Sequence, residues 1–191
     1  MKMRSSCPAT FCRRRAAGLT LVEILVTLSI VALLMTLAVP SFKPLLDRWR
    51  VKQGMGALTD ALRLARSEAI KRGGNVVLQK LPNNTKGCQL AEGADDWGCG
   101  WFVYADMNAN GSFETNTNPP DERLQVTELP GGIQVLHRSG ASITLDRWGA
   151  MDSQGTSFTA WVAGASIDAP TTRTLCISSG GRIHEKDGRQ C

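Results

Sequence analysis

One uninterrupted apolar stretch near the start of the chain limits what this sequence can fold into. Residues 19–42 read LTLVEILVTLSIVALLMTLAVPSF, and Glu23 is the single ionisable side chain among these 24 residues. A helix of that length rises about 36 Å, enough to cross the hydrocarbon core of a membrane with some tilt. We therefore expect a transmembrane helix over residues 19–42, followed by a single domain of roughly 150 residues.

The charge distribution orients this segment. All of the net charge of +5 belongs to residues 1–18, which contain Lys2, Arg4 and the run Arg13-Arg14-Arg15 and no acidic residue. Basic residues beside a membrane span stay in the cytoplasm, so the domain that follows is expected on the opposite face. The rest of the chain is balanced in charge, which removes the usual reason to infer nucleic-acid binding from a basic isoelectric point.

Beyond residue 42 the spacing of apolar residues predicts that the helix continues. Proline removes a backbone hydrogen bond and clashes with the preceding turn, so Pro40 is expected to kink the helix. Gly73-Gly74 provides a stop signal. An amphipathic segment over residues 43–73 is therefore expected to pack on the domain. Its predicted apolar face consists of Leu45, Trp49, Leu58, Leu62, Ala65, Ala69 and Ile70.

Residues 75–191 contain short β-type runs separated by turn residues, a pattern that predicts an antiparallel domain of two packed sheets. The fold class expected for the whole chain is α+β. A long kinked N-terminal helix, transmembrane in its first half, packs on an antiparallel β-sandwich-like domain. The expected strands are 76–81, 101–105, 123–129, 133–137, 142–145, 158–162, 174–178 and 182–184.

Four cysteines lie beyond residue 18, at Cys88, Cys99, Cys176 and Cys191. An even number fits two disulfide bonds in an oxidising compartment, and three connectivities are possible. We favour Cys88–Cys99 and Cys176–Cys191, because each bond then links neighbouring parts of the chain. Residues 19–191 have no C-x-x-C pair and no histidine cluster, so neither a metal nor a cofactor is expected.

The segment Gly18-Leu19-Thr20-Leu21-Val22-Glu23, with the basic leader before it and the apolar run after it, resembles the processing signature of type IV prepilins. That family has a leader ending in glycine, then an apolar or aromatic residue, and a glutamate at the fifth position after the cut. Pro40, the twenty-second residue after the cut, matches a proline that is common there. Leu19 departs from the usual phenylalanine, and the leader of 18 residues is long for the simplest pilins.

This resemblance implies that a prepilin peptidase removes residues 1–18 and that the new amino terminus at Leu19 is methylated. It also implies a single-pass protein of the bacterial inner membrane with a periplasmic domain, whose helix 19–42 forms the core of a filament. Glu23 costs roughly 2–3 kcal/mol inside an apolar span. Its implied partner is the amino terminus of an adjacent subunit, which would set the register of packed helices. The alternative is an ordinary membrane anchor in which Glu23 reaches back to the interface.

Three later segments look like the GspH/FimT group of minor pilins and pseudopilins. They are Ala65–Gly73, Gly100–Asp106 and Gly181–His184. Membership implies a structural protein, not an enzyme, that helps to initiate assembly at or near the tip, with other pilins or pseudopilins as partners. The residues Ala38-Val39-Pro40-Ser41-Phe42 favour a type IV pilus, and the alternative is the GspH-type component of a type II secretion pseudopilus.

Some members of the FimT branch bind DNA through a Gly-Arg-x-Arg motif near the C-terminus. The candidate DNA contacts here are Arg182, His184, Lys186 and Arg189. Acidic residues alternate with these cations, so phosphate binding would be weak and sensitive to salt. The alternative is a polar terminal hairpin tied by a Cys176–Cys191 bond.

Two further features bear on chemistry. Residues 106–111 match the first half of a calcium loop, but Thr117 stands where such a loop needs a bidentate glutamate. Catalysis has little support, because His137 and His184 are the only histidines and neither a serine nucleophile elbow nor a phosphate loop is present.

Overall fold

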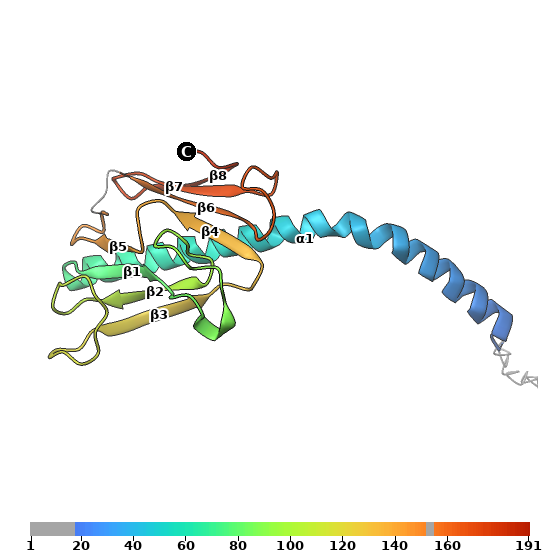
Figure 1. The fold of residues 1–191 in the computed structure, drawn as a ribbon, viewed down its shortest axis with the longest axis horizontal. Helices are drawn as coiled ribbons and strands as arrows, with labels where there is room; N and C mark the ends of the chain where they lie inside the picture. The colour runs from blue at the N-terminus through green and yellow to red at the C-terminus, as the bar shows by residue number, and fades with distance from the viewer. Residues whose placement is uncertain (1–17, 152–154) are drawn as a thin grey trace, which may run out of the picture. The chain divides into compact units, whose positions relative to one another are not determined.

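The computed structural model describes residues 18–151 and 155–191, and within these the side chains of residues 37–41 are outside the description. The chain divides into two compact units, residues 1–42 and residues 43–191. Helix α1 (Leu21–Arg72) contributes to both units, and each unit is described by itself (Figure 1). Of the predicted leader 1–18, residues 1–17 lie outside the described residues.

The described part of the first unit is helical from Leu21 onward and exposes its side chains. The hydroxyls of Thr27, Ser29 and Thr36 donate to main-chain carbonyls three or four residues earlier, at 2.7 to 2.9 Å. The helix therefore satisfies these polar groups internally, as a helix surrounded by apolar material must.

The part of the chain that the structure describes contains no helix both long and apolar enough to cross a membrane. The span predicted at residues 19–42 includes residues 37–41, whose side chains are not described. The kink predicted at Pro40 falls among the same residues and stays a prediction.

In the second unit, α1 buries one stripe of side chains, each no more than 2% exposed. The stripe consists of Val51, Met55, Leu58, Leu62, Ala65 and Ala69. Intervals of four and three residues place all six on one face of the helix. The helix ends as expected at the two glycines, where Gly73 has φ +81° and the Gly74 amide donates to the Ala69 carbonyl at 2.8 Å.

The predicted apolar face of this helix was partly wrong. Leu45, Trp49 and Ile70 are more than half exposed, whereas Val51 and Met55 are buried in their place. At 100° per residue, Trp49 lies about 160° around the helix from Val51. The helix therefore turns one apolar stripe to the sheets and leaves a second set of apolar residues outside.

Within the described ranges, eight strands form two four-stranded antiparallel sheets, so the predicted α+β class is confirmed. One sheet has the order β3-β2-β1-β5 and the other the order β4-β6-β7-β8. The bounds are β1 Val76–Lys80, β2 Gly100–Ala105, β3 Glu122–Glu128, β4 Ile133–His137, β5 Ser142–Leu145, β6 Thr156–Val162, β7 Arg173–Ile177 and β8 Ile183–Asp187. Strand β8 is longer than expected because its polar residues continue the ladder with β7, as in the pair Thr174 and Lys186.

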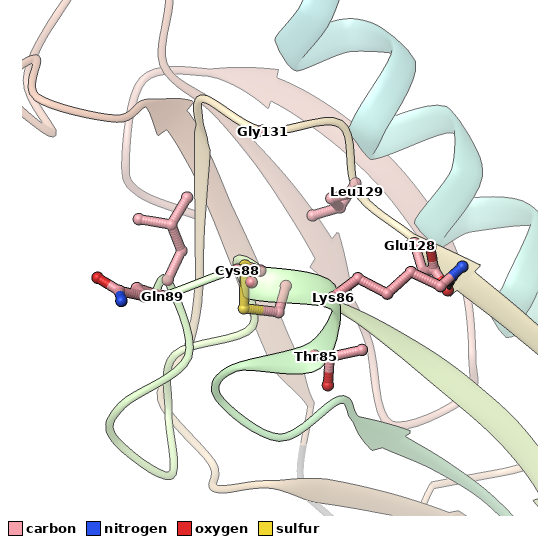
Figure 2. Close-up of a pocket in the computed structure, with 10 residues that line it drawn as sticks. Thr85, Lys86, Cys88, Gln89, Glu128, Leu129 and Gly131 are labelled. Carbon is pink, nitrogen blue, oxygen red and sulfur yellow. Dashed lines mark ion pairs between the residues drawn. A yellow bond between two sulfur atoms is a disulfide. The ribbon is translucent and has the colours of Figure 1, made fainter.

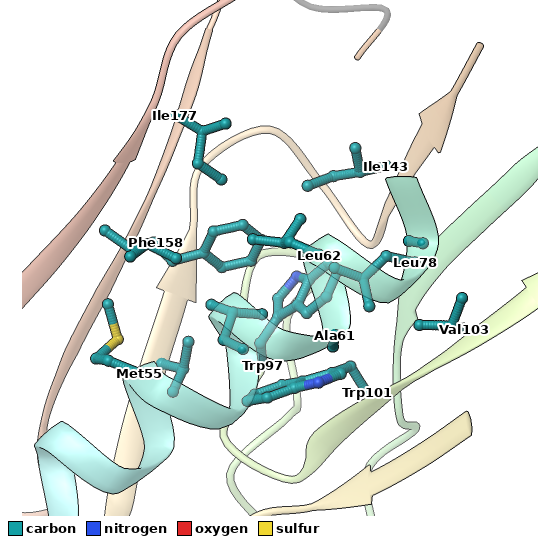
Figure 3. Close-up of a cluster of buried hydrophobic side chains, with 14 of the residues drawn as sticks. Met55, Ala61, Leu62, Leu78, Trp97, Trp101, Val103, Ile143, Phe158 and Ile177 are labelled. Carbon is teal, nitrogen blue, oxygen red and sulfur yellow. The ribbon is translucent and has the colours of Figure 1, made fainter. Parts of the chain in front are cut away.

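The main core lies between α1 and both sheets (Figure 3). Trp97 and Trp101 are fully buried there beside Phe158, whose ring lies edge-on to Trp97 with centroids 5.1 Å apart. The Trp97 indole N–H donates to the Gly140 carbonyl at 3.0 Å. A second cluster lies on the other face of the first sheet, around Phe102 and Tyr104, next to the segment that carries Cys88 and Cys99.

His137, at the end of β4, is fully buried in the main core. Its ring stacks on Phe158 with centroids 4.3 Å apart, and its two ring nitrogens lie 2.8 Å from the Gly140 carbonyl oxygen and the Thr156 hydroxyl. Burial lowers the pKa of His137 below its ordinary value of 6.5, while the Gly140 carbonyl and the Asp95 charge act in the opposite direction. The imidazole is therefore a neutral packing residue at neutral pH.

The lowered pKa of His137 predicts a pH dependence of stability. In acid the unfolded chain binds a proton at His137 more readily than the folded chain does. The free energy of unfolding is therefore highest above pH 6.5 and falls as the pH drops below that value. The slope is at most about 1.4 kcal/mol per pH unit. Urea unfolding of the full chain in detergent between pH 5.5 and 8 measures it. The slope should disappear in His137→Gln and remain in His184→Gln; an unchanged slope in His137→Gln contradicts the prediction.

Candidate assembly surface and C-terminal hairpin

The predicted processing site lies immediately before α1. Gly18, Leu19 and Thr20 are non-helical and exposed. The Thr20 hydroxyl accepts a hydrogen bond from the Glu23 amide at 3.2 Å, which caps the helix. Glu23 itself stands in the first turn, where the helix dipole favours a negative charge. This local structure explains where the helix starts and leaves residues 18–20 non-helical and exposed before it.

Apart from Thr20 and Thr27, the side chains within four residues of Glu23 on the helix are apolar. Leu21, Val22, Ile24 and Leu25 are between 42% and 76% exposed, so the isolated unit leaves their apolar surface uncovered. Within the described residues, the Glu23 carboxylate has no ion pair and accepts no side-chain hydrogen bond. A lone carboxylate in an apolar surface is costly unless the surroundings supply a partner.

The two disulfide bonds are Cys88–Cys99 and Cys176–Cys191, the pairs expected from the sequence. The first connects the segment after β1 to the turn just before β2, and the second connects β7 to Cys191. Beside Cys88–Cys99 lies a hollow of about 470 Å³ (Figure 2). Its two charged lining residues, Lys86 and Glu128, pair with each other at 2.8 Å. The sulfurs and the two charges that line the hollow are therefore engaged with each other.

The four candidate DNA contacts are all exposed but are not equally free. The Lys186 ammonium donates to the Cys191 carbonyl oxygen at 2.9 Å, and Arg189 pairs with Asp168 at 3.2 Å. Arg182 and His184 remain exposed beside them. Half of the predicted set is therefore used to hold the C-terminal tail.

Gly181 of the Gly181-Arg182 motif has a structural role that the sequence pattern did not indicate. Its carbonyl oxygen accepts a hydrogen bond from the Arg66 guanidinium of α1 at 3.1 Å. A Cβ at Gly181 would lie 2.5 Å from Nη1 of Arg66, and one at Gly149 would lie 2.4 Å from Cγ of the same side chain. Arg66 thus packs against two glycines from distant turns, and its hydrogen bond ties Gly181 to the helix. The sequence indicates that both glycines lie in turns, but it contains no long-range pattern that predicts their contact with Arg66.

The calcium-like loop is closed by its own hydrogen bonds. Asp106 is buried and accepts bonds from the Asn110 and Gly111 amides at 3.3 and 2.6 Å, and Asp121 accepts bonds from the Met107 and Glu114 amides at 2.9 and 2.7 Å. In the residues that the structure describes, no three His, Cys, Asp or Glu side chains are grouped to hold a metal ion. The carboxylates therefore act as turn acceptors.

Two family comparisons cover most of the chain. Residues 55–181 match the family described as type II transport protein GspH, and residues 13–39 match the prokaryotic N-terminal methylation motif. The chain belongs to the GspH family. The second match includes Gly18, Leu19 and Glu23, so the N-terminal signature of membrane-anchored pilins is present. This GspH-family chain is a structural protein of the minor pilin and pseudopilin class.

Two known proteins resemble this GspH-family chain, one in sequence and the other in fold. The pilin-like protein PilA1 of Thermus thermophilus is 30% identical over 165 residues, which cover 86% of this chain and 87% of that protein. Two crystal structures of the type IV minor pilin FimU of Pseudomonas aeruginosa match with TM-scores of 0.51 and 0.54 at 21% identity. They cover 71% and 73% of this chain and 91% and 90% of theirs, and the likeness shows a shared fold.

The contact of Arg66 with Gly181 predicts a specific loss of stability. Gly181 has φ +76°, which a residue with a side chain adopts at a cost, and an added methyl group would displace the guanidinium. Gly181→Ala should lower the free energy of unfolding by about 1–3 kcal/mol in urea titrations. The matched control is Gly180→Ala, where a Cβ meets nothing within 4 Å, and the change should stay within about 0.5 kcal/mol. Equal losses in both variants would contradict the role assigned to Gly181.

Proposed function

We propose that this chain is a minor pilin that a prepilin peptidase cuts after Gly18 and that helps to initiate or cap a type IV pilus, to which it attaches through helix residues 19–42. The observation that carries the proposal is the first unit of the structure. Its helix exposes apolar side chains on all sides and presents one carboxylate among them. A surface of this kind is stable only when lipid or other apolar helices cover it.

The exposed segment before the helix supports the cleavage step. Gly18 has no side chain to block access to the main chain, and the residues from Gly18 to Thr20 are non-helical and exposed. Cleavage after Gly18 creates a positive amino terminus at Leu19, which methylation would keep cationic. This proposed positive charge lies next to the apolar helix. The Glu23 carboxylate of an adjacent subunit supplies the negative charge that pairs with it.

The pairing of Glu23 with the amino terminus of a neighbouring subunit would fix how the helices are staggered. Neither charge is favourable alone in an apolar environment, and their attraction is strongest where water is excluded. Only the stagger that brings the two charges together avoids an unpaired charge. We therefore propose that Glu23 selects the register of the packed helices. The apolar residues around it supply most of the attraction between them.

The location follows from the N-terminal signature and the disulfides. We propose a single-pass anchor in the bacterial inner membrane before assembly, with the arginine run 13–15 on the cytoplasmic side. The domain would then lie in the periplasm, where its two disulfide bonds persist. The proposed partners are the prepilin peptidase and other pilins, and the position after assembly is at or near the filament tip.

The proposed work of the protein is assembly, without turnover of a substrate. Of its two histidines, His137 is buried with both ring nitrogens engaged, and His184 lies exposed on β8. DNA binding by the hairpin is not part of the proposal. Arg173 pairs with Glu185 at 3.0 Å and with Asp187 at 3.1 Å, so these charges are paired with each other within the domain.

A second candidate function is that of a pseudopilus component in type II secretion, which the description of the matched family favours. Both functions use the same N-terminal helix for assembly, but one belongs to a type IV pilus and the other to a type II secretion pseudopilus. Recovery of the chain in sheared surface pili supports the pilus. Its absence from pili, combined with a secretion defect when the gene is deleted, supports the pseudopilus.

Glu23 provides the experiment that tests the proposed function. Glu23→Ala should leave the shift in gel mobility that accompanies leader removal unchanged, and should reduce the fraction of the chain recovered in filaments at least tenfold. The matched control is Thr27→Ala, one turn further along the same exposed helix, which should assemble normally. Normal recovery of Glu23→Ala in filaments would contradict the proposed role of the helix carboxylate.

A further inference from the structure

The hydroxyl of Thr20 takes a place that a main-chain carbonyl would otherwise occupy. At the start of α1 the Ile24 amide donates to the Thr20 carbonyl at 3.2 Å, in the regular helical pattern. The preceding amide is that of Glu23, whose regular acceptor, four residues earlier, is the Leu19 carbonyl. In the structure this amide donates to the Thr20 hydroxyl instead, at 3.2 Å. The helix therefore starts at Leu21 and leaves Leu19 outside.

The surroundings of the Glu23 amide make an acceptor necessary. Leu21 and Val22 expose apolar side chains beside it, and in the proposed function lipid or other apolar helices cover them. In such surroundings an amide without an acceptor costs about as much as a lost hydrogen bond. The amide therefore bonds to the Thr20 hydroxyl or, where that is absent, to the Leu19 carbonyl. In the second case Thr20 adopts helical backbone angles and Leu19 becomes the capping residue.

The choice between these two acceptors affects the bond that is proposed to be cut. Its hydrolysis adds one water molecule across the Gly18–Leu19 peptide bond and yields a Gly18 carboxylate and a Leu19 amino group. A peptide that binds as an extended chain is held through its free main-chain groups. With the helix starting at Leu21, Gly18 and Leu19 are non-helical and exposed. A helix that began one residue earlier would engage the Leu19 carbonyl and would have to unwind before the peptidase could bind.

We infer that Thr20 is a positioning residue for this cleavage. Its hydroxyl fixes the start of the helix at Leu21 and keeps the Gly18–Leu19 bond in the non-helical form that the peptidase binds. The inference rests on the proposed function and adds a residue to its first step. Thr20 acts through the Glu23 amide and not through contact with the peptidase, so any side chain that places an acceptor at the same position meets the requirement.

The sequence before the cut gives this stop a purpose. Ala16 and Ala17 precede Gly18, and alanine has the highest helix propensity of all residues, so only the glycine opposes a longer helix there. Threonine is among the residues that favour the capping position. Thr20 is also distinct from the other hydroxyl residues described between residues 18 and 36, which donate to helix carbonyls: Thr27, Ser29 and Thr36.

Cleavage kinetics of the full-length chain in lipid vesicles, with purified prepilin peptidase, test the inference. Thr20→Val removes the acceptor and keeps the shape of the side chain, whereas Thr20→Ser and Thr20→Asn keep an acceptor. Thr20→Val should raise KM about two- to fivefold and leave kcat unchanged, because only the fraction of substrate with a free Leu19 carbonyl binds. Thr20→Ser and Thr20→Asn should stay within about twofold of the wild type in both constants.

The matched control is Thr27→Val, which removes a hydroxyl that donates to the Ile24 carbonyl and should be cut like the wild type. A rise in KM confined to Thr20→Val supports the inference. A fall in kcat in that variant, with or without a change in KM, shows that Thr20 contacts the peptidase during the reaction and overturns it. Slow cleavage of Thr20→Asn together with Thr20→Val also overturns it, because the peptidase then recognises the residue and not the acceptor.

The position of the cut separates this inference from the proposed function. Mass spectrometry of the products should show that the peptidase cuts the wild type and Thr20→Val after Gly18. A wild type cut after Gly18, with the same KM and kcat in Thr20→Val, rejects the role of Thr20 and keeps the proposed function. A wild type that the peptidase does not cut after Gly18 rejects both.

Discussion

Burial of one helix stripe between two sheets is the constraint on which the second unit depends. Val51, Met55, Leu58 and Leu62 are the large members of this stripe, and each is at most 2% exposed. At about 1.5–3 kcal/mol for each such side chain, their burial contributes roughly 6–12 kcal/mol. Neither sheet alone surrounds the stripe, since the core contains residues from both. The helix is therefore the element that joins the two sheets into one domain.

This use of the helix leaves its other surfaces available. Before residue 37 the described helix exposes apolar side chains together with Glu23. After residue 43 the same element holds the domain through one face and exposes Trp49 and Gly56 on the opposite face. In the proposed function, a single helix attaches a folded domain to a filament, with one segment used for assembly and another for folding.

The sequence predicted the features that depend on local pattern. Turn residues and β-type runs located all eight strands, and neighbouring cysteines indicated both disulfide bonds. The apolar face of α1 was partly misassigned, because Trp49 is apolar but lies outside the stripe. Local pattern also missed the contact of Arg66 with Gly181, which joins residues 115 positions apart. The burial of His137 was equally invisible, because it depends on Phe158 and Thr156 from another strand.

The central claim is that the chain is processed into a subunit whose first residue is Leu19. Intact-mass and peptide mass spectrometry of the protein isolated from membranes of cells with an active prepilin peptidase tests it most directly. The account predicts the loss of residues 1–18 and one added methyl group on the amino terminus of Leu19. A chain that keeps its leader in these membranes, or one cut within or after the apolar helix, would contradict it.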